Sequence, residues 1–232
     1  MNEKTFLEKI RVLNRTTLKL IAVVSMLIDH MGAVLFDDLY WMRAVGRLAM
    51  PIFCFFIAEG YYHTRDRKKY LLRMGLFALI AELPFDLAFN GTPFFWGHQN
   101  VMCTFFLAIS AMWAFDEITL RNEGKKGRIL GALAAFGVAI AATLLQTDYG
   151  AFGVAMVFLF HILRENGLLV QNIGALIYQF FARGAGIQAF AMLSAIPLMM
   201  YNGKKGRPLK WFFYCFYPGH LLILWAIKNF AL

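Results

Sequence analysis

The sequence predicts an all-α, polytopic membrane protein, a transmembrane helical bundle of about nine spanning helices with a cytoplasmic N-terminus. Of its 232 residues, 60% are hydrophobic and only 16% are charged, whereas soluble domains are about half apolar and a quarter charged. Apolar stretches recur almost without pause from Leu18 to Leu232. Basic residues also gather in alternate loops. These observations predict a single transmembrane domain over residues 1–232, with residues 1–17 as a cytoplasmic N-terminal segment.

The spanning stretches follow from where the apolar runs begin and end. The first follows a segment with several basic residues and has no small-residue cleavage site, so we expect a retained helix rather than a signal peptide. The sixth is short and the seventh carries Gln171, Asn172 and Gln179. If those two form one re-entrant element, the C-terminus changes sides. The predicted spans are 18–36, 43–62, 69–89, 101–118, 129–146, 150–164, 168–183, 186–201 and 211–230.

The orientation follows from the lysines and arginines, because short loops rich in these residues stay in the cytoplasm. With the N-terminus inside, all of the 23 basic residues fall on the cytoplasmic side except Arg43, Arg47, Arg183 and Lys228. This distribution predicts a multi-pass protein of the cell (inner, cytoplasmic) membrane. The net charge of +9 is accounted for by topology and lipid contact, so no nucleic-acid partner is expected.

Polar residues inside the predicted spans are the first indication of function, because a charge at membrane depth is costly and usually faces the bundle interior. Glu82 and Asp86 are four residues apart and share a helix face. By the predicted topology one set lies in the extracytoplasmic half, where mutual pairing offsets burial. Its members are Asp29, His30, Arg47, Glu82, Asp86, Gln99, Asn100 and Asp148.

A second polar set lies at the opposite, cytoplasmic end of the second and third spans and could hold an anion. Its members are Glu59, His63, Thr64, Arg65, Arg67, Lys68, Lys69 and Arg73. Between the two sets, Tyr217 and His220 adjoin Pro218 in the last span. Proline interrupts the helical hydrogen-bond ladder there, and such backbone is tolerated only beside protein or a water-filled cavity.

Structural interpretations stand beside these functional ones. Arg47 could form a buried ion pair with Glu82 or Asp86 that serves only the fold. His161 is interpreted as a packing or interfacial histidine. His30 is different, because it follows an acid and is level with an arginine, and its unperturbed pKa suits a general base. The sequence has no HExxH or paired-cysteine spacing, so no metal site is expected.

At these residues the chain resembles the TraX family, membrane proteins named for acetylation of a pilin subunit. It also resembles, more distantly, transmembrane acyltransferases that modify exported glycans, at His30 and Arg47. The matching blocks run through nearly the whole chain: LKLIAVVSMLIDHMGAVLF, GRLAMPIFCFFIAEGYYHTRDRKKYLLR, AELPFDLAF, QNVMCTFFL, DYGAFG and FFYCFYPGHLLIL.

The resemblance implies an acetyltransferase that uses acetyl-CoA as donor and acts on an exported peptide or glycan on the outer side. The CoA phosphates would remain at the cytoplasmic cluster Arg65, Arg67, Lys68, Lys69 and Arg73, and Tyr217 and His220 would line the channel inward. His30 would be the base. Asp29 or Glu82 would orient it, with Asp86 nearby, and Arg47, Gln99 or Asn100 would donate to the oxyanion.

Two other classes stay open. A proton-coupled membrane transporter would also place charged residues at one depth, beside a proline in the middle of a span. A purely structural or assembly protein would need fewer buried charges than this sequence carries.

Overall fold

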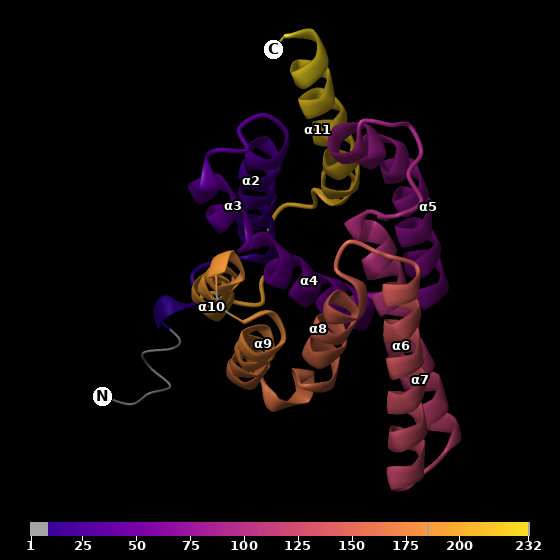
Figure 1. Cartoon of the computed structure of the whole chain (residues 1–232). Coiled ribbons are helices and arrows are strands. Elements are labelled where there is room, and N and C mark those ends of the chain that lie inside the picture. The colour runs from indigo at the N-terminus through magenta and orange to yellow at the C-terminus, as the bar shows by residue number, and fades with distance from the viewer. Residues whose placement is uncertain (1–8, 185, 232) are drawn as a thin grey trace. The chain divides into compact units, whose positions relative to one another are not determined.

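The computed structural model describes residues 9–184 and 186–231, and in that part of the chain it is helical, without a β-strand. The predicted all-α fold is confirmed. The chain forms two compact units: unit 1 comprises Met1–Phe53 and Leu163–Leu232, and unit 2 comprises Cys54–Ile162 (Figure 1). The single domain expected over residues 1–232, the number of spans and their orientation stay predictions.

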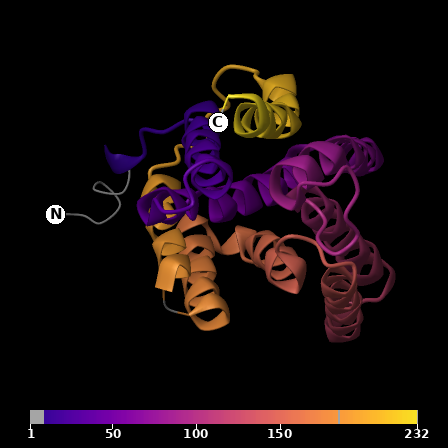
Figure 2. The same ribbon diagram turned by 45° about the horizontal axis from the view of Figure 1, so that its top comes forward.

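Unit 1 is built from both ends of the chain. Asn14 caps its first long helix by accepting a hydrogen bond from the N–H of Thr17 at 3.0 Å. Helix α2 packs on α3 and α11, and α9 packs on η3 and α10 (Figure 2). The elements are α2 (Arg15–Val34), α3 (Tyr40–Gly46), the first turn of α4 (Ala49–His63), η2 (Arg164–Asn166), α9 (Leu168–Arg183), η3 (Gly186–Ser194), α10 (Ala195–Met199) and α11 (Lys210–Phe230).

The second predicted span is two helices rather than one. Helix α3 ends at Gly46 and α4 begins at Ala49, so Arg47 lies in the break between them. Pro51 supplies the physical reason, because proline has no N–H to donate and its ring clashes with the carbonyl four residues earlier, that of Arg47. Arg47 itself keeps helical dihedral angles, φ −60° and ψ −21°.

Unit 2 is built around an antiparallel helix pair, α6 and α7, that lie side by side along their length (Figure 1). Gly131 permits this approach, because a Cβ atom there would lie 2.9 Å from the Phe115 carbonyl oxygen. Helices α5 and α8 pack on α6. The elements are the rest of α4, α5 (Arg67–Phe85), the π-helix η1 (Asp86–Asn90), α6 (Val101–Arg121), α7 (Gly124–Leu144) and α8 (Gly150–Ile162).

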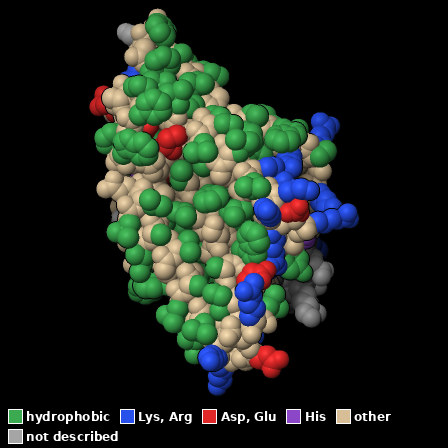
Figure 3. All heavy atoms as spheres, turned by 90° about the vertical axis from the view of Figure 1, so that its right-hand side faces the viewer, with side chains coloured by type: hydrophobic (Ala, Val, Ile, Leu, Met, Phe, Trp, Pro, Cys, Tyr) green, Lys and Arg blue, Asp and Glu red, His purple; other side chains and the backbone are tan. Residues whose placement is uncertain are grey.

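Four helical stretches in the described residues are long and apolar enough to cross a membrane: α2, α3 with α4 (Tyr40–His63), α6 and α7. Helix α7 turns Leu133, Phe136 and Leu144 outward, each at least 60% exposed. Such a surface suits lipid rather than water. Figure 3 shows apolar side chains over much of the face it presents, with lysine and arginine side chains along its right-hand side and at its lower end.

Candidate functional site

Asp29 forms the centre of a buried ion cluster in unit 1. Both its carboxylate oxygens accept hydrogen bonds from Nη2 of Arg47, at 2.5 and 2.6 Å. Arg43 Nη1 lies 3.0 Å from Oδ2 and also donates to the backbone carbonyl of Asp29 at 2.9 Å. We call Asp29, Arg43 and Arg47 the Asp29 cluster. Two guanidinium groups share one carboxylate, so the cluster carries a net positive charge.

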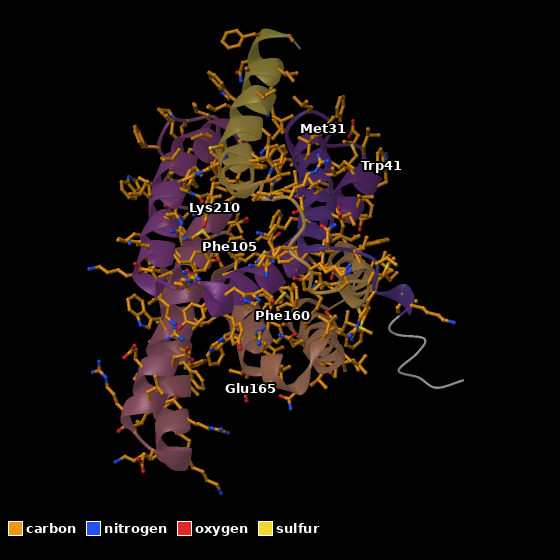
Figure 4. The ribbon with its side chains drawn as sticks, turned by 180° about the vertical axis from the view of Figure 1, so that it is seen from behind. Met31, Trp41, Phe105, Phe160, Glu165 and Lys210 are labelled. Atoms are coloured by element: carbon orange, nitrogen blue, oxygen red, sulfur yellow. The ribbon has the colours of Figure 1, made fainter. Side chains whose placement is uncertain are left out.

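Two glycines let α2 and α3 approach closely enough to form the Asp29 cluster. A Cβ atom on Gly46 would lie 2.1 Å from the Cβ of Asp29, and one on Gly32 would lie 2.8 Å from the Cβ of Met42. Met31 and Trp41, labelled in Figure 4, mark this pairing of α2 with α3. Because larger side chains do not fit at either glycine, the position of Asp29 depends on this contact.

His30, the next residue on α2, is hydrogen-bonded to a second histidine. Nδ1 of His30 lies 2.7 Å from Nε2 of His220, and Nδ1 of His220 lies 2.7 Å from the carbonyl oxygen of Phe216. A carbonyl only accepts, so Nδ1 of His220 donates its proton there. In neutral rings Nε2 of His220 then accepts from Nδ1 of His30. Nε2 of His30 is therefore the nitrogen that carries the basic lone pair.

Tyr217 completes the surroundings of this histidine pair. Its ring centre lies 6.1 Å from that of His30 and 5.9 Å from that of His220, edge to face in each case. Tyr217 and His220 are both buried, and Pro218 removes one backbone hydrogen bond from α11 in the same turn. The structure thus places His30, Tyr217 and His220 together, and His220 is the residue that orients the ring of His30.

Glu82 and Asn100 are joined in unit 2. The Asn100 side-chain amide donates to Glu82 Oε2 and to the carbonyl oxygen of Ala78, and its oxygen accepts from the N–H of Met102. Asn100 therefore caps α6 and ties it to α5. No described residue hydrogen-bonds the other carboxylate oxygen of Glu82, Oε1, although it is buried.

Asp86 closes the loop that follows α5. Its Oδ2 accepts from the N–H of Phe95 at 2.8 Å and its Oδ1 from the amide of Asn90 at 3.0 Å. Asp86 is 1% exposed and opens the π-helix, two residues after Pro84. These contacts hold the loop between α5 and α6 against a buried carboxylate. Asp29, His30 and Arg47 belong to unit 1 and Glu82, Asp86 and Asn100 to unit 2, so a single cluster of all six stays a prediction.

His98 and Asp148 fasten two loops of unit 2 to each other. Their side chains lie 3.2 Å apart, and the N–H of Asp148 donates to the carbonyl of Gln99 at 2.8 Å. The hydrogen bond that His98 donates to the Asp148 carboxylate is the main reason that the pKa of His98 is raised above its usual value of 6.5. We call this arrangement the loop clasp.

The predicted cytoplasmic basic segment lies at the start of α5. Arg65, Lys68 and Lys69 are exposed, and Asp66 caps the helix by accepting from the N–H of Lys69 at 2.8 Å. Arg67 differs, because its Nη2 lies 3.0 Å from Asp116 Oδ2 and its guanidinium lies 4.6 Å from the ring centre of Tyr61. One member of the segment is thus fixed by side chains of two other helices.

Asp116 binds two further side chains, neither of which was expected to meet it. The Tyr61 hydroxyl donates to Oδ2 at 2.9 Å, and Nε2 of His161 lies 2.9 Å from Oδ1. We call Tyr61, Arg67, Asp116 and His161 the Asp116 cluster. Sequence reasoning passed over Asp116 and Tyr61 and interpreted His161 as a packing residue. The signal that could have found the cluster is an acid inside a predicted span.

Comparison with known proteins supplies the family. The model of the family described as TraX protein matches residues 14–228. The chain belongs to the TraX family. This confirms the resemblance in the sequence blocks and, with the apolar helices, identifies a membrane protein.

Two curated relatives bear on the family assignment. The chain is 32% identical over 241 residues to a probable fimbrial assembly protein FimC (serogroup H1) of Dichelobacter nodosus, covering 92% of this chain and 95% of that one. It is 51% identical over 73 residues to an uncharacterized protein of Rickettsia prowazekii (strain Madrid E), covering 32% of this chain and 27% of that one. No solved structure matches the chain.

Proposed function

We propose that this TraX family protein moves an acetyl group from acetyl-CoA to an amine or hydroxyl presented on the extracytoplasmic side of the cell membrane. The observation that carries the proposal is the hydrogen-bond chain from Phe216 through His220 to His30. It sets the tautomer and orientation of His30, so that Nε2 is the nitrogen able to take a proton.

In the proposed reaction, Nε2 of His30 acts as the general base. His30 accepts the proton of the acceptor N–H or O–H as the acceptor attacks the thioester carbonyl. The tetrahedral intermediate then breaks its C–S bond, CoA leaves as a thiolate, and the proton passes from His30 to sulfur. A positioned base of this kind contributes about 10²- to 10⁴-fold to the rate.

The Asp29 cluster supports the negative charge that develops on the carbonyl oxygen. Arg47 is already bound by both oxygens of Asp29, and its side chain is 10% exposed, whereas that of Arg43 is 32% exposed. Arg43 is therefore the better candidate to reach an oxyanion, with Arg47 fixing the carboxylate. Preorganised donors aimed at developing charge are often the largest single contribution to catalysis.

The remaining residues singled out in the sequence have supporting roles in this proposal. Tyr217 lines the histidine pair, and Glu82, Asp86 and Asn100 order the loops of unit 2. The phosphates of acetyl-CoA bind the basic residues at the start of α5, which also meet lipid headgroups. The related Dichelobacter nodosus protein is named as a probable fimbrial assembly protein, which favours an exported peptide over a glycan as acceptor.

The test uses purified full-length protein with radiolabelled acetyl-CoA and an amine or hydroxyl acceptor. His30→Ala is expected to lower acetyl transfer by about 10²- to 10⁴-fold while donor binding is retained. His98→Gln, which alters a histidine of the loop clasp, is the matched control and should transfer normally.

Three outcomes would contradict the proposal. Wild-type protein that does not bind acetyl-CoA would refute it outright, and near wild-type turnover by His30→Ala would refute the base assignment. Proton-driven solute uptake by proteoliposomes, without acetyl transfer, would identify a transporter instead. Mass spectrometry of exported peptides and glycans from cells with and without the protein would identify the acceptor.

A further inference from the structure

The Asp116 cluster brings together four side chains from four helices of unit 2. Tyr61 comes from α4, Arg67 from α5, Asp116 from α6 and His161 from α8. Oδ2 of Asp116 accepts a hydrogen bond from the Tyr61 hydroxyl at 2.9 Å and forms an ion pair with Nη2 of Arg67 at 3.0 Å, while Oδ1 lies 2.9 Å from Nε2 of His161. The carboxylate is therefore held from three directions and has one orientation.

Arg67 is the member of the cluster that can meet a ligand. Asp116 engages Nη2 and the Tyr61 ring covers one face, yet the Arg67 side chain remains 38% exposed. A guanidinium has five N–H donors in a fixed fork, so one carboxylate contact leaves donors for a second oxyanion. Helix α5 begins at Arg67, and the positive end of a helix dipole favours anions.

The four basic neighbours of Arg67 do not share its fixed position. Arg65 and Lys68 are exposed. Lys69 pairs with Asp66 at 3.3 Å, and the guanidinium of Arg73 lies 5.8 Å from the ring of Tyr70, so each of these two contacts a residue close to it in sequence. Long exposed side chains lose conformational entropy when they bind, whereas an immobilised side chain has already lost it. Arg67 is thus the member of the basic segment whose guanidinium is held by side chains of two other helices.

We propose that Arg67 binds a phosphate group of a soluble or lipid-borne anion and that Asp116 is the residue that positions it. Tyr61 and His161 hold Asp116, Asp116 and the Tyr61 ring hold Arg67, and the free edge of the guanidinium binds two phosphate oxygens. This inference extends the proposed function. It rests on that function only if the bound anion is the CoA part of acetyl-CoA. Phosphate binding itself is tested separately from acetyl transfer.

Replacing Asp116 distinguishes positioning from simple charge. Asp116→Asn removes a negative charge beside Arg67, so long-range electrostatics alone would make anions bind more tightly. Loss of positioning does the opposite, and restoring the mobility of one long side chain weakens binding about two- to tenfold. Weaker anion binding by Asp116→Asn would therefore indicate that Asp116 positions Arg67, and tighter binding would indicate a purely electrostatic role.

The experiment measures dissociation constants of inorganic pyrophosphate and of CoA for the full-length protein in detergent without anionic lipid. Asp116→Asn should bind both two- to tenfold more weakly, and Asp116→Glu should recover most of the loss. Arg67→Lys, which keeps the charge but loses the fork, should also weaken binding. Lys125→Ala with Lys126→Ala, which removes exposed charge at the α6–α7 turn, is the control and should leave both constants unchanged.

A parallel arm places the protein in nanodiscs with or without an anionic phospholipid. Competition by that lipid against pyrophosphate, lost in Arg67→Lys, would identify a headgroup as the natural source of the phosphate. Unchanged or tighter pyrophosphate binding by Asp116→Asn would overturn the proposal, and so would wild-type protein that binds neither anion nor lipid. Pyrophosphate binding without binding of acetyl-CoA would leave this inference standing and refute the proposed function.

Discussion

The two units each contain a carboxylate with arginine and histidine nearby, but they connect these groups differently. In unit 1, Asp29 binds two arginines, and His30 is hydrogen-bonded to His220. In unit 2, one carboxylate, Asp116, binds an arginine, a histidine and a tyrosine together. The same residue types therefore form an ion cluster beside a histidine pair in one unit and a single shared network in the other.

The difference separates two chemical roles. If both rings are neutral, the hydrogen bond to His220 leaves the lone pair of His30 on Nε2, and the proposed base would lie next to a cluster with net positive charge. His161 donates Nε2 to a carboxylate that also holds an arginine, so its contact serves the position of that arginine. We infer that unit 1 carries the proton transfer and that the Asp116 cluster carries anion binding.

The largest expected effect comes from removing the two carboxylates. Asp29→Ala leaves Arg47, 10% exposed, without its buried partner, and breaking a buried ion pair costs about 3–5 kcal/mol. Asp116→Ala should cost less, about 1–3 kcal/mol, because water reaches Arg67. The midpoints of thermal unfolding in one detergent should therefore fall further for Asp29→Ala.

The control for this comparison is Asp38→Ala, which removes an exposed acid from the loop between α2 and α3. Its midpoint should stay within a degree or two of wild type, since surface substitutions usually change stability by less than about 0.5 kcal/mol. Equal losses in Asp29→Ala and Asp116→Ala would show that the two clusters contribute alike to stability, contrary to their difference in burial.

Gly46→Ala tests whether the Asp29 cluster depends on close helix contact. The added methyl would lie 2.1 Å from the Asp29 Cβ, so α3 must move away from α2, at a cost of about 1–3 kcal/mol. Acetyl transfer should fall along with the melting temperature, because Arg47 is displaced with α3. Gly137→Ala, where no atom lies within 4 Å of the added methyl, is the matched control, and equal melting temperatures for the two would contradict the contact.

Much of the fold could be predicted from the sequence because lipid-exposed helices must be long and apolar. The structure places a helix in every predicted span, including the short sixth one, Gly150–Ile162. The exceptions are local. The break at Arg47 depends on a proline four residues later, and the 186–201 range begins as a 3₁₀-helix, Gly186–Ser194, which hydropathy does not distinguish from an α-helix.

The candidate site was less predictable because side-chain pairing depends on tertiary packing. Hydropathy and charge singled out Asp29, His30 and Arg47. The spacing of residues could not reveal that His220, 190 positions away, would form a hydrogen bond with His30. Asp116 illustrates the opposite case. It lies in a predicted span, where an acid is costly, yet its partners come from three other helices and no local pattern joins them.

The smallest expected effect concerns another histidine–carboxylate pair, the loop clasp, which is more exposed than either cluster. Because Asp148 raises the pKa of His98, the clasp is fully stabilised below about pH 6.5, the value for an unfolded histidine. This stabilisation is lost as the pH rises through the higher pKa of the folded state. After correction for intrinsic exchange, amide hydrogen exchange in residues 146–149 should therefore be slower at pH 5.5 than at pH 8.5. His98→Gln should abolish the difference without altering exchange in α2, and a pH dependence that survives in this variant would assign it to another group.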